Sequence, residues 1–369
     1  MSRQYLFNPE NDLALAQNTA NYTPPPAAVR LRRAGATLPL WFAGDDDYVI
    51  TDGVNARWLT EIQNRFGIKA RLFSTYAEGM TPAPWGWSKA ARRLFEYRGV
   101  PAYAMPDDEQ LDRLRELSHR RTASLIAQAL TGCSAPAAIE CRTFDDVKTF
   151  TDRAGAAVVK LPWSSSGRGV IPVNPADIER QRQQIEGAIR RQGSVMVEPR
   201  YDKLLDFAVL FHIENGKCLY DGLSVFDTAG FSSYAGNVLA SHDELHATIC
   251  QALGGKELFD SVVSQLPAVL ENIIGDAYSG PLGIDMMAVK ASGYSLVPAV
   301  ELNLRMTMGH LCHRFYRDHV AEGRRGRFSI LPQISSGSID CRAIDGRIIS
   351  GNLDLAQPGS DFSFIISIE

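Results

Sequence analysis

Apolar and polar residues follow a strand-like pattern at the start of the chain. Residues 4–7 form a short apolar run that ends at Asn8-Pro9, because proline cannot continue a central strand. A second predicted strand covers residues 38–43 and ends in an acidic turn. Between them, an extended proline-rich run at 22–26 leads into a predicted helix over 27–34. The order strand, helix, strand predicts an open α/β unit, whose ligands bind beyond the carboxyl ends of the strands.

A polar cluster follows the first predicted strand and would lie at that ligand-binding edge. Its members are Asn8, Glu10, Asn11 and Asp12. Two interpretations stay open for them: they form part of a substrate site, or they cap the next helix.

Period-two patterns dominate the middle and later parts of the chain. Apolar strands are predicted at 157–161, 170–173 and 194–198, and the glycine-rich stretch Pro162–Gly169 joins the first two as a hairpin. Residues on both sides of Asn215-Gly216 alternate, which predicts a second hairpin. The remaining predicted elements are helices at 178–191, 258–274 and 309–320, a helix starting near Glu109, and a third hairpin with strands at 283–290 and 294–302.

Composition narrows the class of protein. A chain of 369 residues favours two or three cores, and 45% apolar residues argue against wholesale disorder. Lys and Arg number 38 against 42 Asp and Glu, so the net charge is 38 − 42 = −4. A nucleic-acid binder is usually strongly basic, so we expect no nucleic-acid partner, and any bound anion must be held by a local site.

Cysteine placement and hydropathy bear on the compartment. The six cysteines are dispersed and never form a Cys-x-x-Cys pair, which is typical of reduced thiols. The first residues lack the apolar stretch of about 7 to 15 residues that a signal peptide needs, and no window approaches the roughly 18 apolar residues of a membrane span. We therefore expect a cytoplasmic protein with no membrane partner.

Two groups of residues suggest phosphate and metal chemistry. In the glycine-rich stretch, small residues let backbone N–H groups approach a phosphate, and Lys160 on the preceding strand adds a fixed positive charge. Glu301, Asn303 and Arg305 lie two residues apart and share one face of a strand, and Asp285 on the partner strand can point to the same face. Two carboxylates and an amide oxygen suit Mg²⁺. A plain turn and a structural Arg305–Glu301 ion pair stay open as alternatives.

In the order and spacing of these groups, residues 110–320 resemble the ATP-grasp superfamily. The resemblance implies that a nucleotide lies between two α+β subdomains under the glycine-rich hairpin, and that an open α/β domain precedes them. It implies nucleotide contacts from Lys160, the hairpin, the strand end at Glu198 and the acidic Asp206. The hairpin residues that match are Ser164, Ser165, Ser166, Gly167 and Gly169. By the same resemblance Asp285, Glu301 and Asn303 match magnesium ligands, while Arg305 and Lys160 match residues that act on the transferring phosphate.

The sequence departs from the ATP-grasp pattern at two places. A lysine is usual at the start of the helix before the hairpin, where this chain has Ser118-His119-Arg120-Arg121, so Arg120 or Arg121 is the candidate replacement. The stretch Ser224–Asn237 holds no basic residue, although many members of the superfamily have one there that faces the phosphates.

The resemblance gives expectations for the domains and the function. It implies an N-terminal domain at 1–108, a nucleotide-binding subdomain at 109–199, and a metal-bearing C-terminal subdomain at 200–369. It further implies a ligase that uses ATP and Mg²⁺ to join a small carboxylate to an amine through an acyl phosphate, and it suggests a homodimer. A small-molecule kinase and a nucleotide-binding protein without catalysis remain the alternatives.

Overall fold

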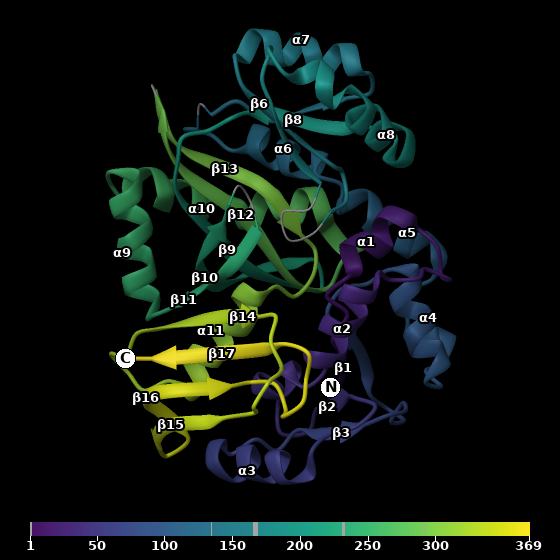
Figure 1. The fold of residues 1–369 in the computed structure, drawn as a ribbon, viewed down its shortest axis with the longest axis vertical. Coiled ribbons are helices and arrows are strands. Elements are labelled where there is room, and N and C mark those ends of the chain that lie inside the picture. Colours follow the sequence, from purple (N-terminus) through teal and green to yellow (C-terminus); the bar gives the residue numbers. More distant parts are fainter. Residues whose placement is uncertain (1, 134, 165–168, 231–232, 292) are drawn as a thin grey trace.

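The computed structural model describes residues 2–133, 135–164, 169–230, 233–291 and 293–369. Within these ranges the strands form three sheets, which succeed one another along the chain. Figure 1 shows the small sheet within residues 139–199 at one end of the molecule, the strands of residues 203–303 in the middle, and the N-terminal strands beside the last strands of the chain at the other end.

The N-terminal unit is a parallel four-stranded sheet in the order β3-β2-β1-β4, which confirms the predicted open α/β unit. Its strands are β1 (Arg3–Leu6), β2 (Tyr48–Ile50), β3 (Arg71–Phe73) and β4 (Thr81–Pro84). Its helices are α1 (Asn11–Gln17), α2 (Pro26–Ala34), α3 (Ala56–Phe66) and α4 (Lys89–Tyr97), with 3₁₀ turns at Leu38–Trp41 (η1) and Ala102–Ala104 (η2).

The strand predicted at 38–43 is wrong, because Leu38–Trp41 is the 3₁₀ turn η1 and strand β2 follows the acidic turn instead. Pro39 lies in the first turn of η1, where its missing N–H costs nothing, and all four residues are buried. The Trp41 indole N–H donates to the carbonyl of Leu355 at 3.2 Å. The apolar run is therefore a buried turn packed between the N-terminal unit and the last strands of the chain, rather than a strand.

The middle part contains a small antiparallel sheet in the order β5-β8-β6-β7. Its strands are β5 (Ile139–Cys141), β6 (Ala157–Lys160), β7 (Val170–Val173) and β8 (Val195–Pro199). Its helices are α7 (Phe144–Ala154) and α8 (Arg182–Gln192), with the turn η3 (Ile178–Gln181) before α8. The pairing of β6 with β7 confirms the predicted hairpin around the glycine-rich stretch.

The largest sheet has nine strands in the order β13-β12-β9-β10-β11-β14-β17-β16-β15. The strands are β9 (Lys203–Glu214), β10 (Lys217–Ala229), β11 (Ser233–Leu239), β12 (Gly280–Ala291), β13 (Tyr294–Asn303), β14 (Gly326–Leu331), β15 (Ile339–Ile344), β16 (Arg347–Asp354) and β17 (Ser363–Ile368). The accompanying helices are α9 (His242–Leu253), α10 (Glu257–Ile274) with the turn η4 (Gly275–Ala277), and α11 (Met308–His319).

The two predicted hairpins of this sheet are confirmed. β9 pairs with β10 across Asn215-Gly216, whose φ angles of 50° and 71° give both residues the left-handed backbone that a tight hairpin needs. β12 pairs with β13 in the register that sets Asp285 opposite Glu301.

Two large cores explain how the units hold together. One core joins the N-terminal sheet to the last strands of the chain, with Phe7 and Trp41 in the same cluster as Phe328, Phe364 and other residues of β14–β17. The other covers the β9, β10, β12 and β13 part of the large sheet and includes side chains from α10 and from the two helices α5 (Asp108–Leu117) and α6 (Arg121–Ala129). The small sheet has a core of its own.

Two further observations concern the class of protein. All six cysteines are described, and each is a free thiol. Among the described residues, no helix combines the length and the apolarity needed to cross a bilayer.

Candidate active site

One cavity of about 650 Å³ is lined by side chains from the small sheet, from the large sheet and from α1, α2 and α11, and by Trp85, the residue after β4. Eight of the candidate site residues line it: Arg120, Lys160, Glu198, Asp206, Asp285, Glu301, Asn303 and Arg305. Residues separated by up to 185 positions in sequence are thus brought together, as the resemblance implied.

The candidate residues of the glycine-rich hairpin are described only at its two ends. Ser165, Ser166 and Gly167 lie outside the described residues. Ser164 is buried and lines a smaller hollow together with Asp12, Glu301 and Arg305. Gly169 has a φ of 77°, and its carbonyl accepts a hydrogen bond from the Leu161 N–H at 2.9 Å, which closes the base of the hairpin.

The acidic pair lies on neighbouring strands. Asp285 on β12 is directly opposite Glu301 on β13, and Asn303 lies two residues further along the same face. Burial and the negative charge of Glu301 raise the pKa of Asp285 to about 7, although Arg305, a hydrogen bond from Asn303, and Arg120 oppose the rise. The site therefore concentrates negative charge that the protein neutralises only in part.

These residues fit a magnesium ion. The mutual repulsion that raises the pKa of Asp285 would be relieved by a divalent cation between the two carboxylates. Among the described residues, no group of three or more His, Cys, Asp and Glu side chains could hold a metal ion. Two carboxylates and an amide form an incomplete oxygen set, which suits Mg²⁺ because Mg²⁺ commonly keeps water and phosphate oxygens as its other ligands.

The two arginines of the site are paired with different carboxylates. Arg305 donates from Nε to Asp12 Oδ1 at 3.0 Å and from Nη2 to Asp12 Oδ2 at 2.7 Å, so the predicted alternative of an Arg305–Glu301 pair is wrong. Glu301 instead forms an ion pair with Arg120, with 2.8 Å between Arg120 Nη1 and Glu301 Oε2. Burial alone would lower the pKa of the Arg305 guanidinium. The Asp12 carboxylate stabilises its protonated form, and the pKa is raised.

Arg120 also ties helix α6 to the hairpin. Its Nε donates to the Leu161 carbonyl at 3.0 Å, and its Nη2 donates to Ser164 Oγ at 3.3 Å. The guanidinium therefore bridges the strand that bears Glu301 and the start of the glycine-rich stretch. Its position fits the proposed replacement for the missing lysine.

Lys160 and Glu198 form a buried ion pair with a distance of 2.5 Å between Lys160 Nζ and Glu198 Oε1. Strands β6 and β8 are neighbours, and Glu198 is opposite Val158, so the two charged residues lie on adjacent positions of one sheet. Their side chains are only 9% and 7% exposed. Each of these buried charges depends on the other, because an unpaired charge at this depth would destabilise the folded state.

Lys203 is a cavity residue that the sequence analysis missed. Its Nζ lies 2.5 Å from Asp206 Oδ2 and 2.7 Å from Thr228 Oγ1, and all three residues line the cavity. Thr228 belongs to the stretch Ser224–Asn237, which holds no basic residue of its own. Lys203 thus brings a positive charge to that stretch from the neighbouring strand. The sequence signal for this contact is the position of Lys203 three residues before Asp206, at the start of the same strand, β9.

The N-terminal polar cluster divides into structural residues and cavity residues. The Asn8 amide donates to the Gly86 carbonyl at 2.8 Å and accepts from the Gly86 N–H at 3.3 Å, which fixes the loop after β4. Asp12 holds Arg305, and Glu10 lines the cavity. Neither the substrate interpretation nor the helix-cap interpretation covers all of them, and Glu10, the residue at the helix cap position, makes no side-chain cap.

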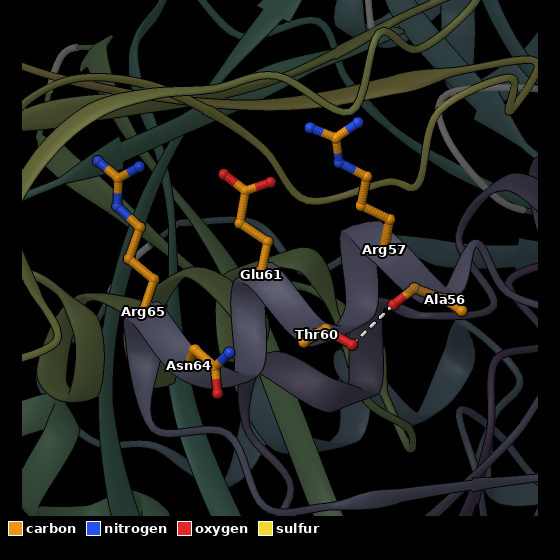
Figure 2. Close-up of a pocket in the computed structure, with 6 residues that line it drawn as sticks. All are labelled: Ala56, Arg57, Thr60, Glu61, Asn64 and Arg65. Atoms are coloured by element: carbon orange, nitrogen blue, oxygen red, sulfur yellow. Dashed lines mark hydrogen bonds between the residues drawn. The ribbon is translucent and has the colours of Figure 1, made fainter.

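A second hollow of about 680 Å³ lies along one side of α3. Figure 2 shows Arg57, Glu61 and Arg65 extending from successive turns on the same side of this helix. Its other lining residues are Ala56, Thr60 and Asn64, so one helix alone forms it. It contains none of the candidate residues, and we place the site in the cavity between the sheets.

No protein-family model matches the chain, and no curated protein matches it in sequence. Several solved structures are similar in fold. Biotin carboxylase from Campylobacter jejuni is 11% identical, with 100% of this chain and 88% of that chain covered and a TM-score of 0.54. L-amino acid ligase from Bacillus licheniformis is 12% identical, with 100% and 93% covered and a TM-score of 0.49.

N5-carboxyaminoimidazole synthetase from Staphylococcus aureus is 9% identical, with 100% and 93% covered and a TM-score of 0.48. At such low identity the likeness to the biotin carboxylase is evidence of a shared fold alone. The chain therefore shares its overall fold with this biotin carboxylase.

Proposed function

We propose that this protein is an ATP- and Mg²⁺-dependent ligase that joins a carboxylate to an amine. The observation that supports it most is the convergence on one cavity of an acid pair, Asp285 and Glu301, with the cations Lys160 and Arg305. Transfer of a phosphoryl group needs this combination, because the protein must position the reactants and neutralise the negative charge that develops.

Each residue has a proposed task. Asp285, Glu301 and Asn303 would hold magnesium, which would supply charge neutralisation at the phosphate oxygens. Lys160 binds nucleotide phosphate and Arg305, oriented by Asp12, stabilises charge on the transferring group. Asp206, Glu198 and the hairpin residues Ser164 and Gly169 belong to the nucleotide end of the cavity.

The proposed reaction has two steps. A carboxylate oxygen of the substrate attacks the γ-phosphorus of ATP, ADP leaves, and an acyl phosphate forms. An amine then attacks the acyl carbon, and phosphate leaves with the two electrons of the carbon–oxygen bond. The amine nitrogen loses a proton to solvent or to phosphate. A closed cavity protects the acyl phosphate from hydrolysis.

The test is to incubate the protein with ATP, Mg²⁺ and pools of carboxylates and amines while measuring ADP and phosphate. Release of both that requires a carboxylate and an amine together supports the proposal. A stable phosphorylated product would instead identify a kinase, and no turnover with a clear thermal shift by ATP and Mg²⁺ would identify a binding protein. Asp285→Ala should abolish turnover, whereas Glu61→Gln, on the exposed face of α3, should not change it.

A further inference from the structure

The end of the cavity away from Lys160 and Glu198 has a wall of its own. Two parts of the chain that are distant in sequence build it: helices α1 and α2 near the start, and strand β14 with the loop before β17 near the finish. We name this region the acceptor end and define it by Glu10, Leu13, Ala28, Leu31, Ile330 and Phe362.

The acceptor end is mostly apolar. Leu13, Ala28 and Leu31 come from the helices, and Ile330 and Phe362 come from β14 and the loop before β17, so both parts of the chain contribute apolar groups to the cavity. Such a surface favours a ligand with an apolar body, because covering it removes apolar area from water.

Glu10 is the exception in this wall. The residue is 5% exposed, and its Oε1 receives Arg32 Nη1 at 2.6 Å, so the carboxylate keeps a cationic partner. Its other oxygen, Oε2, is shielded from solvent and has no hydrogen-bond partner. Glu10 stands at the N-cap position of α1 but does not use its side chain to cap the helix. Helix formation therefore does not explain the charge.

An unpartnered carboxylate oxygen at a buried position needs an explanation, because an acceptor that loses water and gains no hydrogen bond destabilises the folded state. Glu10 lines the cavity, and the last torsion of a glutamate side chain has a broad range, so Oε2 can turn toward a ligand there. A ligand group that donates hydrogen bonds and bears a positive charge would then satisfy it. A protonated amine has both properties.

We propose that the acceptor end binds an amino acid with an apolar side chain, whose ammonium group donates to Glu10. The apolar side chain lies against Leu31, Ile330 and Phe362, and the carboxylate of the same molecule extends toward Arg305 and the acid pair. The inference rests on the proposed function and names the class of its carboxylate substrate.

The test measures binding to the protein saturated with a non-hydrolysable ATP analogue and Mg²⁺. Isothermal titration uses valine, leucine, methionine and phenylalanine, the same molecules without the amine (such as 4-methylpentanoate for leucine), and the polar amino acids aspartate and lysine. We expect at least one apolar amino acid to bind about tenfold or more tightly than its amine-free counterpart. In Glu10→Gln that difference should disappear, whereas Glu61→Gln, a matched change of charge on α3, should keep it.

A second variant keeps the test decisive if Glu10→Gln folds poorly. Leu31→Phe narrows the acceptor end and leaves Glu10 in place, so it should weaken phenylalanine about tenfold more than valine. Equal binding with and without the amine, binding of polar amino acids only, or no binding of any amino acid would each overturn the inference. The thermal shift by the ATP analogue and Mg²⁺ is read separately, so its presence leaves the proposed ligase standing and its absence contradicts the ligase itself.

Discussion

Asp285 should destabilise the free protein at neutral pH, and Asp285→Asn should therefore raise stability while it removes a metal ligand. Burial and the neighbouring Glu301 raise the pKa of this carboxyl from 3.8 to about 7. An acid with a raised pKa holds its proton more tightly in the folded state than in the unfolded state. Its contribution to stability is complete below pH 3.8 and is lost as the pH rises through 7.

The magnitude follows from the size of the shift. A change of about three pKa units corresponds to about 4 kcal/mol, at about 1.36 kcal/mol per unit. Relaxation and solvent around a partly exposed group reduce this figure, so we expect Asp285→Asn to add about 2–4 kcal/mol above pH 7.5. Asparagine has nearly the same shape and can donate a hydrogen bond to Glu301, so no cavity offsets the gain.

The assay compares melting temperatures of the wild type, Asp285→Asn and the exposed control Glu61→Gln between pH 4 and 8.5, without metal or nucleotide. The wild type and Asp285→Asn should converge near pH 4 and separate steadily up to about pH 7.5, with the control following the wild type. At pH 7.5, ATP with Mg²⁺ should stabilise the wild type and not the variant. A constant difference across this pH range, or a less stable variant at pH 8, would refute the reasoning.

Three more predictions concern the paired charges of the cavity. Lys160→Met leaves Glu198 buried without a partner and should lower the free energy of unfolding by about 3–5 kcal/mol in denaturant titrations. Adding Glu198→Gln to this variant should recover most of the lost stability. Failure to recover it would contradict the ion-pair argument. Arg305→Lys loses the bidentate contact with Asp12, so kcat should fall about 100-fold or more in steady-state assays. An unchanged kcat would argue against the proposed role of Arg305 in stabilising the transferring group. Arg120→Gln removes the ion pair with Glu301, so calorimetry should find tighter binding of Mg²⁺ alone and weaker binding of nucleotide. Weaker binding of both would contradict the idea that Arg120 competes with Mg²⁺ for the Glu301 carboxylate.

Local patterns were sufficient to predict the hairpin that bears Asp285 and Glu301, but not its exact register. Two irregularities in the pairing lie between Asp285 and the turn, so the turn alone does not place Asp285 opposite Glu301. The Asn215-Gly216 turn was also predictable from its local pattern, since few residues other than asparagine and glycine tolerate a left-handed backbone.

Contacts between distant residues were not predictable from one sequence. The partner of Arg305 is Asp12, 293 positions away, and nothing in the local pattern distinguishes it from Glu301, only four positions away. The run at Leu38–Trp41 was assigned to a strand because an apolar stretch of four residues fits either a strand or a buried turn. Its burial depends on β14–β17, whose participation in the large sheet the sequence did not indicate.

The shared core has a consequence for how the protein folds during synthesis. The N-terminal sheet is made first, but part of its apolar covering, including Phe364 and Ile366 of β17, leaves the ribosome only after more than 360 residues have been translated. About 280 residues separate the last strand of the N-terminal sheet from Ile366, so at about 5–20 residues per second this delay is about 15–55 s. During that interval Trp41 can contact Phe66 but lacks Phe315 and the Leu355 carbonyl, so the emerging chain should depend on a chaperone that shields exposed apolar surface.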